Sequence, residues 1–348
     1  MRRMVDIIPK IRMMLMDSDE KGVLRLCEGG ANDADISVSD IDELKNELKE
    51  AVRKPTSVFF NGIGLLRFTK WSTGGRLDQK VSIVTGSAQG FGRGIAEEMV
   101  KNGAYVVIAD LNHDLAEQVS DELNAKYGKD ATMAVRVDVG DEESIKDMMT
   151  ETVARYGGLD IFVNNAGILK AGSLEEMNAQ TFELVTKINY TAYFLCTKYA
   201  SQVMKAQNEA NGNYFTDIIQ INSKSGLDGS NKNFAYAGGK FGGVGLTQSF
   251  AKELVVHNIK VNAICPGNFF DGPLWSDPVN GLFAQYLNTG KVSGAKTVED
   301  VKKHYESMVP MNRGCETIDV ARALFYLVEQ QYETGQAMPV TGGQIMLN

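Results

Sequence analysis

The sequence has few cysteines and histidines, and their positions exclude most sites that depend on them. Its four cysteines form no Cys-x-x-Cys pair, the spacing typical of redox and zinc sites, and lie far apart (Cys27, Cys196, Cys265 and Cys315). We therefore expect reduced thiols, as in a cytoplasmic protein. None of the three histidines is near a cysteine, so a zinc ion would need ligands from remote segments (His113, His257 and His304). We expect no metal.

Long apolar runs and net positive charge are also absent. The sequence has no run of about eighteen apolar residues, so we expect no segment that spans a membrane. Residues 1–16 begin like an export signal, but Asp6, Lys10 and Arg12 interrupt the apolar stretch, and an amphipathic helix is the better interpretation. The formal net charge of −8 repels phosphodiester backbones and anionic surfaces, so we expect neither nucleic acid nor a membrane as a partner.

Residues 1–76 differ in pattern from the rest of the chain. Apolar residues at helical spacing predict a helix over 40–53, with Ser39 as its N-cap and Pro55 beyond its end. A β-rich stretch follows over 57–68, interrupted by Gly62 and Gly64, and residues 72–75 are typical of a linker. We expect a small N-terminal α/β extension of unknown role, joined to one larger domain over residues 77–348.

From Val81 onward, short apolar runs alternate with amphipathic segments. The runs predict strands over 81–85, 105–109, 131–137, 160–163, 215–221 and 259–265, and the segments predict helices over 92–102, 114–127, 142–156, 179–206 and 234–257. Strict alternation of this kind favours the α/β class, a doubly wound (Rossmann) parallel sheet with helices on both faces. In such sheets, ligands bind outside the carboxyl ends of the strands.

A glycine-rich turn lies between the first of these strands and the next helix. Gly86, Gly90 and Gly92 permit a tight turn that brings the backbone close to a pyrophosphate at the positive end of that helix. Asp110 ends the second strand, 18 positions after Gly92, where a carboxylate accepts hydrogen bonds from an adenosine ribose. That carboxylate repels a 2′-phosphate, which favours NAD over NADP. The alternative is a solvated aspartate in a strand-end turn.

The glycine turn is joined by Asn164-Asn165-Ala166-Gly167 and by Tyr236-x-x-x-Lys240. This set resembles the short-chain dehydrogenase/reductase family over roughly residues 77–348. The resemblance implies an oxidoreductase that acts on CH–OH groups and assembles as a homodimer or homotetramer. It also implies a set of cofactor-binding residues: Gly86, Gln89, Gly90, Phe91, Gly92, Asp110, Leu111, Asp138, Val139, Asn165, Ala166, Gly167, Tyr236, Lys240, Pro266 and Gly267.

Tyr236 and Lys240 are one helical turn apart, so their side chains share a face. A free tyrosine has a pKa near 10, and a nearby ammonium group lowers it toward the range of a general base. Such pairs are also common on amphipathic helices without any catalytic role. The resemblance implies that Tyr236 takes the substrate proton and that Lys240 also holds the nicotinamide ribose. Gly238 and Gly239 in the same helix suggest close approach of a cofactor or a partner helix.

Two further catalytic residues follow from the resemblance. Ser223 matches the family serine that hydrogen-bonds the reacting oxygen, with Ser225 as the rival assignment. Asn189 matches the asparagine at a helix distortion that holds a water molecule on the proton path from the lysine. The predicted catalytic residues are therefore Asn189, Ser223, Tyr236 and Lys240.

A narrower similarity concerns the substrate. Residues 218–226, 240–249, 309–315 and 340–344 are similar to the family members that oxidise C2 of sorbitol 6-phosphate to give fructose 6-phosphate with NAD. The substrate-binding residues this implies are Ser223, Lys224, Tyr236 and Asn268. Lys224 is the candidate for phosphate, or else a solvated lysine at the rim.

Residues 268–308 correspond to the substrate lid of the family. Basic residues there either close over a phosphate or form a solvated helix face (Lys291, Lys296, Lys302, Lys303 and His304). Two other functions stay open: another sugar-alcohol dehydrogenase of the same family, and a regulator that senses NAD without turnover.

Overall fold

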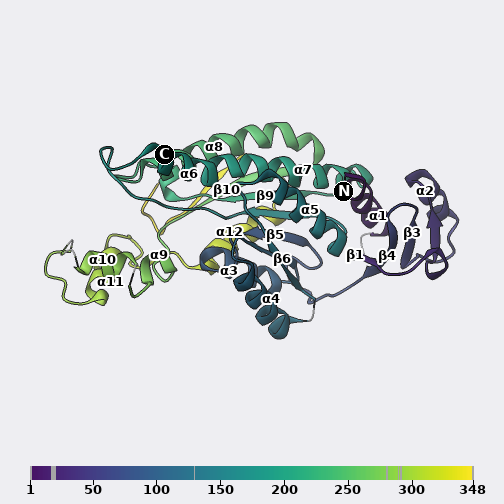
Figure 1. Ribbon diagram of the computed structural model, residues 1–348, viewed down its shortest axis with the longest axis horizontal. Coiled ribbons are helices and arrows are strands. Elements are labelled where there is room, and N and C mark those ends of the chain that lie inside the picture. Colours follow the sequence, from purple (N-terminus) through teal and green to yellow (C-terminus); the bar gives the residue numbers. More distant parts are fainter. Residues whose placement is uncertain are drawn as a thin grey trace.

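The computed structural model describes residues 2–16, 21–128, 130–279, 281–288, 290 and 292–346. A seven-stranded sheet in the order β11-β10-β9-β8-β5-β6-β7 forms its centre (Figure 1). All neighbouring strands of this sheet are parallel, which confirms the predicted class. Its strands are β5 (Val81–Thr85), β6 (Tyr105–Asp110), β7 (Thr132–Arg136), β8 (Ile161–Asn164), β9 (Thr216–Ile221), β10 (Ile259–Pro266) and β11 (Ala337–Val340).

Helices cover both faces of the sheet (Figure 1). One face carries α5 (Glu142–Tyr156), α7 (Ala192–Ala210) and α8 (Phe234–Leu254), and the other carries α3 (Gly90–Lys101), α4 (His113–Tyr127) and α12 (Thr317–Glu329). The helix predicted over 179–206 is interrupted. It consists of α6 (Ala179–Thr186), a π-helical turn at Lys187–Thr191, and α7. No helix in the described ranges is both long and apolar enough to cross a bilayer.

The N-terminal extension contains α1 (Arg2–Leu15), α2 (Ile41–Glu50) and a four-stranded sheet in the order β1-β4-β3-β2. Its strands are β1 (Val23–Cys27), β2 (Ile36–Val38), β3 (Ser57–Phe60) and β4 (Gly64–Thr69). The predicted N-cap of α2 is wrong. Asp40 is the cap and accepts a hydrogen bond from the Glu43 N–H at 2.8 Å, while the Ser39 N–H donates to the Glu43 carboxylate. This reciprocal pair leaves the Ser39 side chain outside the cap.

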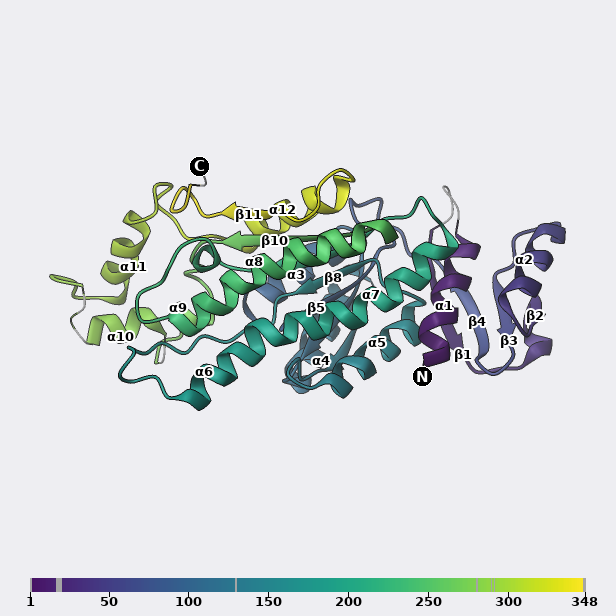
Figure 2. The same cartoon turned by 90° about the horizontal axis from the view of Figure 1, so that it is seen from above.

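Helix α1 attaches the extension to the large sheet. It lies beside α7 (Figure 2), with Ile8, Ile11 and Leu15 fully buried in the same hydrophobic core as α5 and α7. Arg12 is also fully buried and forms an ion pair with Asp160 at 2.8 Å. Asp160 stands just before β8 and accepts the N–H of Val81, the first residue of β5, at 2.6 Å. The contact is therefore at the amino ends of the central strands.

A helical module lies at the opposite end of the molecule from the extension (Figures 1 and 2). We call it the lid module after the lid predicted for this part of the sequence. It comprises α9 (Pro273–Ser276), α10 (Leu282–Asn288) and α11 (Val298–Ser307). Its own small core consists of Phe270, Trp275, Phe283, Val301 and Val309. The module falls within the insertion expected over residues 268–308.

Candidate active site

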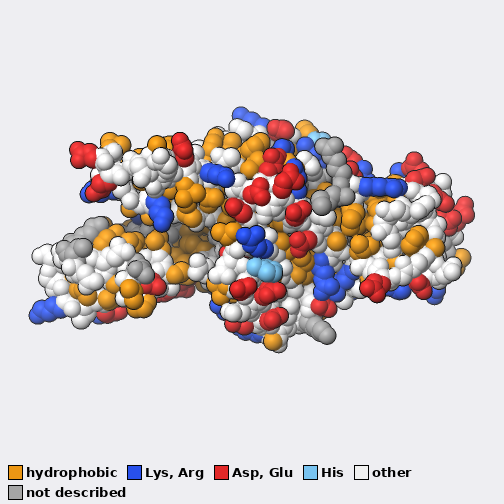
Figure 3. Space-filling view, viewed as in Figure 1, with side chains coloured by type: hydrophobic (Ala, Val, Ile, Leu, Met, Phe, Trp, Pro, Cys, Tyr) orange, Lys and Arg blue, Asp and Glu red, His pale blue; other side chains and the backbone are white. Residues whose placement is uncertain are grey.

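A cavity of about 1120 Å³ opens where β5, β6, β8, β9 and β10 end. Figure 3 shows the molecule hollowed between the lid module and the body, with hydrophobic side chains on the walls. Of the predicted catalytic, cofactor-binding and substrate-binding residues, only Gly92 and Asn189 do not line it. Those that do are Gly86, Gln89, Gly90, Phe91, Asp110, Leu111, Asp138, Val139, Asn165, Ala166, Gly167, Ser223, Lys224, Tyr236, Lys240, Pro266, Gly267 and Asn268.

The glycine turn is built for close packing. Gly86 and Gly90 have φ angles of +64° and +60°, which favour glycine. A Cβ on Gly92 would lie 2.2 Å from the Gly86 carbonyl oxygen, so no other residue fits without movement. The Asn165 amide donates to the carbonyls of Thr85 and Gly86, at 2.9 and 3.0 Å, and holds the turn in place. Gln89, the N-cap of α3, makes no side-chain capping bond. A cradle of this shape at a helix N-terminus fits a pyrophosphate.

Asp110 stands on the rim beside this turn. Its carboxylate accepts the N–H groups of Ala88 and Asn112, both at 3.0 Å, which fixes its position at the cavity wall. Among the described residues that line the cavity, the cationic side chains are those of Lys224 and Lys240. The residues at this end therefore fit a ribose with free hydroxyls.

Ser223, Tyr236 and Lys240 come together at the end of β9 and the start of α8. Lys240 Nζ donates to the Ile221 carbonyl at 2.9 Å and lies 5.5 Å from the centre of the Tyr236 ring. The Ser223 side chain is close enough to the Tyr236 phenol to affect the pKa of that phenol. Ser223 Oγ also accepts the Ser225 N–H at 3.1 Å.

The electrostatics of this group differ from the expectation. Burial raises the pKa of Tyr236 above its ordinary value, and the hydrogen bond with Ser223 offsets only part of that rise. Burial also lowers the pKa of Lys240 to about 8. The Lys240 ammonium does not lower the pKa of Tyr236, because the pKa of Lys240 is the lower of the two and the lysine is neutral before the phenol ionises.

Asn189 lies on the π-helical turn, so the predicted helix distortion is present. Its amide donates to the carbonyls of Ile168 and Val185, at 2.8 and 2.9 Å, and its buried Oδ1 has no hydrogen-bond partner among the residues that the structure describes. A Cβ on Gly239 would lie 3.3 Å from the Asn189 Cβ. Gly239 therefore allows α8 to approach the π turn, whereas Gly238 faces open space.

Asn222 is a residue of the site that the sequence analysis missed. It is buried directly before Ser223, and its amide donates to Gln220 Oε1 and to the Lys240 carbonyl at 2.8 and 2.9 Å. Its Oδ1 accepts the Ser223 N–H at 2.8 Å. Asn222 thus connects the segment that contains Ser223 to helix α8, which contains Lys240. Only its place next to Ser223 could have marked it in the sequence.

The lid presents aromatic rather than basic side chains to the cavity, chiefly Trp275, Tyr286 and Tyr305. Lys302 pairs with Asp271 at 2.9 Å and Lys303 with Glu299 at 3.9 Å, and neither lines the cavity. Lys296 and His304 do not line it either. Lys291 falls outside the described residues.

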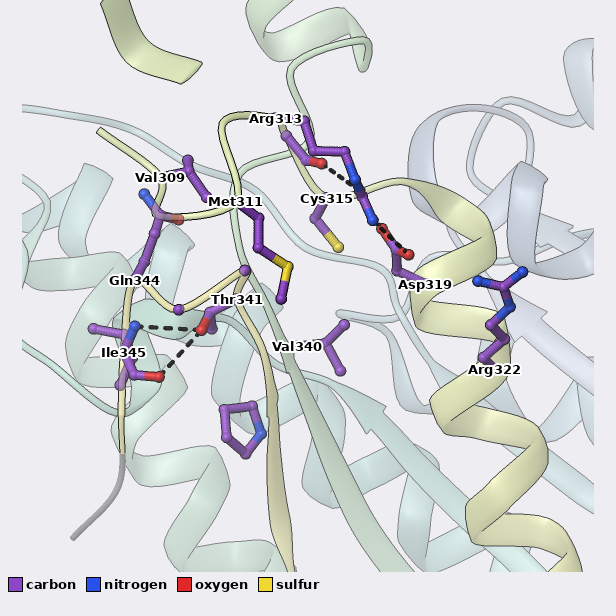
Figure 4. Close-up of a pocket in the computed structure, with 14 residues that line it drawn as sticks. Val309, Met311, Arg313, Cys315, Asp319, Arg322, Val340, Thr341, Gln344 and Ile345 are labelled. Atoms are coloured by element: carbon purple, nitrogen blue, oxygen red, sulfur yellow. Dashed lines mark hydrogen bonds and ion pairs between the residues drawn. The ribbon is translucent and has the colours of Figure 1, made fainter. Parts of the chain in front are cut away.

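A smaller cavity of about 410 Å³ lies beside the main one, between the segment after the lid, the start of α12 and the end of β11 (Figure 4). Arg313 points toward Asp319 on α12 and pairs with it at 2.6 Å. The Cys315 N–H donates to the Asn268 carbonyl at 2.8 Å, so the two cavities share a wall. None of the predicted catalytic, cofactor-binding or substrate-binding residues lines the smaller cavity.

A doubly wound sheet with a glycine turn and a cavity at its carboxyl edge defines a dinucleotide-binding α/β protein. The sequence profile of the short chain dehydrogenases matches residues 80–274, and the chain belongs to this family. Its members use nicotinamide cofactors, NAD or NADP, and the protein is an oxidoreductase that acts on CH–OH groups.

Relatives agree with this assignment over most of the chain. Sorbitol-6-phosphate 2-dehydrogenase of Escherichia coli is 34% identical over 269 residues, 77% of this chain and 99% of the relative. Trans-4-hydroxycyclohexanecarboxylate dehydrogenase of Sinomonas cyclohexanicum is 33% identical over 275 residues, 77% of this chain and 94% of the relative. The crystal structure of sorbitol-6-phosphate 2-dehydrogenase from Erwinia amylovora aligns with a TM-score of 0.68 and 34% identity, over 76% of this chain and all of that one.

Proposed function

We propose that the protein oxidises the C2 hydroxyl of sorbitol 6-phosphate to give fructose 6-phosphate, with NAD as hydride acceptor. The observation that carries this proposal is Lys224, which lines the same cavity as Ser223 and Tyr236 and directly follows the serine. A cation that lines the same cavity suits a phosphate group on the substrate. Similarity to two sorbitol-6-phosphate 2-dehydrogenases supports the same substrate.

The preference for NAD rests on Asp110. Its carboxylate is fixed by two N–H groups at the cavity rim, where it would accept hydrogen bonds from ribose hydroxyls and repel a 2′-phosphate. Gly86, Gly90 and Asn165 would hold the pyrophosphate turn around the cofactor. The bound nicotinamide supplies the carbon that accepts the hydride.

The residues of the chain handle the proton. Ser223 and Tyr236 would hold the substrate hydroxyl by hydrogen bonds, and Tyr236 Oη would accept its proton as the C–H bond breaks. Lys240 would hold the ribose. Asn189, at the π turn, would keep a proton path open behind the lysine.

An NADH absorbance assay with Lys224→Met tests the phosphate site. We expect kcat/KM to fall roughly 10- to 100-fold with sorbitol 6-phosphate, the size of a lost charge-assisted hydrogen bond, and to stay unchanged with sorbitol. Lys232→Met, which changes an exposed lysine outside the cavity, is the matched control. Tyr236→Phe should abolish turnover of both substrates. Equal losses with both substrates in Lys224→Met would remove the phosphate role.

Another sugar-alcohol dehydrogenase is the second candidate, because the lid wall is aromatic and its lysines lie outside the cavity. A substrate panel with sorbitol, mannitol 1-phosphate and sorbitol 6-phosphate separates the two. A regulator without turnover is disfavoured by the intact group of Ser223, Tyr236 and Lys240. Steady NADH production from any polyol excludes that regulator.

We also infer a homodimer or homotetramer that forms through α7 and α8. These helices expose Phe194 and Phe241, which are 44% and 46% accessible, and Gly238 on α8 faces open space. A large apolar side chain beside a glycine on a helix surface suits close packing against a second copy.

The four cysteines form no disulfide in the described chain, which supports a cytoplasmic location.

A further inference from the structure

A short segment between β10 and α9, residues 268–272, leads into the lid module, and we call it the neck. The helices of the module pack chiefly against one another rather than against the helices and strands of the body. They nevertheless form one wall of the main cavity, through Leu274, Trp275 and Tyr305 among others. The position of that wall therefore depends on how the neck is held.

The neck carries a phenylalanine whose ring stacks on a residue of the glycine turn. The rings of Phe269 and Phe91 lie at 17° to each other with their centroids 4.3 Å apart, and both residues line the main cavity. Phe91 is the second residue of α3, so it belongs to the helix start that fits a pyrophosphate. The Phe269 ring also lies close to Gly272, where a Cβ would be 2.5 Å from Phe269 Cδ1. The stack therefore connects the neck directly to the cofactor end of the cavity.

The next residue of the neck connects to the lid itself. Phe270 is buried in the lid core, where its ring centroid lies 5.0 Å from that of Trp275 and 5.6 Å from that of Phe283. Gly314 leaves room for this ring, since a Cβ there would lie 2.8 Å from Phe270 Cδ2. Two consecutive side chains of the neck thus contact the glycine turn and the lid core respectively.

We propose that Phe91 and Phe269 are positioning residues, whose stacked rings hold the neck against the glycine turn and so keep the lid wall of the substrate site in place before any ligand binds. Without either ring, the substrate would have to order the lid as it binds, which weakens binding. This inference rests on the proposed function only in the choice of substrate for the kinetic assay.

Hydrogen exchange measured by mass spectrometry tests the contact without any substrate. In Phe91→Leu, we expect the backbone amides of the neck and α9 to exchange roughly 2- to 10-fold faster than in the wild type, the size of one aromatic pair. Phe269→Leu should give the same increase. The double variant should exceed neither single variant, because both changes remove the same contact.

Steady-state kinetics separate positioning from chemistry. At saturating NAD, Phe91→Leu and Phe269→Leu should each raise KM for sorbitol 6-phosphate roughly 2- to 10-fold and leave kcat within about twofold, because the catalytic group is unchanged. Phe91→Tyr keeps an aromatic ring at this position and should retain the exchange rates and the KM of the wild type. Thermal unfolding of each variant shows whether the fold is intact.

Phe182→Leu is the matched control. It removes one ring of a different stacked pair, with Phe234 at a centroid distance of 6.3 Å, and neither residue lines the main cavity. It should change neither the exchange of the neck nor KM.

The outcomes distinguish this inference from the function on which its kinetic assay rests. Unchanged exchange of the neck in either single variant, or additive increases in the double variant, overturns the positioning role. The expected rise in exchange, found in an enzyme that does not turn over sorbitol 6-phosphate, supports the positioning role and refutes only the proposed substrate.

Discussion

Tyr236 and Lys240 are both buried, and burial opposes the charged form of each. The pKa of Tyr236 is raised and that of Lys240 is lowered to about 8. In the free enzyme at neutral pH, the phenol is therefore protonated. Since kcat/KM reports the ionisation of the free enzyme, we expect the rate of alcohol oxidation to rise from about pH 7 to beyond about pH 9. A profile already flat at neutral pH would show that the phenol is acidic before substrate binds.

Asp110 gives a second prediction at this scale. Asp110→Asn keeps a side-chain oxygen for the N–H groups of Ala88 and Asn112 but removes the negative charge. We expect the ratio of kcat/KM for NAD to that for NADP to fall about tenfold, because repulsion of the 2′-phosphate is lost. An unchanged ratio would mean that Asp110 does not face the adenosine ribose.

Local spacing explains which site residues the sequence predicts. Ser223, Tyr236 and Lys240 stand at fixed intervals in one strand-loop-helix segment, so the sequence motif is enough to predict them. Asn222 was not predicted, because its role depends on a partner that the chain fold brings near. It acts through the carbonyl of Lys240.

At the scale of helices and strands, the exposed face of α7 and α8 is the feature to test. Phe194→Glu combined with Phe241→Glu places charge on the apolar surface that we assign to the subunit contact. We expect the oligomer to dissociate to monomers, which analytical ultracentrifugation measures. Tyr332→Glu, at an almost fully exposed tyrosine between α12 and β11, is the control. A wild type that is already monomeric contradicts the proposed assembly.

Local features explain why the sequence did not predict some of the strands and the π turn. Strand β11 contains Pro339, which is unfavourable inside a sheet and is tolerated because β11 is an edge strand. The apolar pattern over 179–206 continues through the π turn, so it predicts one helix where Asn189 interrupts the regular hydrogen bonds. Strands β1 and β2 of the extension are short and depend on pairing with β4 and β3.

At the scale of the whole molecule, Arg12 joins the extension to the large sheet. Burial alone would raise the pKa of Asp160, but the charges of Arg12 and Lys80 and its hydrogen bonds outweigh burial and lower it to about 2. Arg12→Met leaves this carboxylate buried without its main partner. We expect the free energy of unfolding at pH 7 to fall by about 3–5 kcal/mol in denaturant titrations.

The pH dependence of that loss has a definite sign. In the wild type, the low pKa of Asp160 contributes stability that is present above about pH 4 and lost as the pH falls toward about 2. In Arg12→Met, the carboxyl takes up a proton as the pH falls, so the deficit should be smaller at about pH 4 than at pH 7. Arg76→Met breaks an exposed pair with Glu329 and should change stability by less than about 1 kcal/mol. A similar loss in both variants would mean that burial of Arg12 has no special effect.

The proposed division at residues 76 and 77 stays a prediction about the chain, but the packing qualifies it. The side chains of α1 belong to the same hydrophobic core as α5 and α7, so a boundary in the sequence is not a boundary in the core. Composition marked the linker at 72–75. Composition gave no sign that Arg12 pairs with Asp160, because the two residues lie far apart along the chain.

The ion pair between Arg12 and Asp160 also sets a delay in biosynthesis. The two residues are 148 positions apart, a stretch that a ribosome translates in on the order of 10 s at about 5–20 residues per second. During that time, the apolar face of the first helix has no α7 to cover it. Helix α1 is thus made well before its final surroundings exist, and a chaperone that shields Ile8, Ile11 and Leu15 on the nascent chain should raise the yield of folded protein.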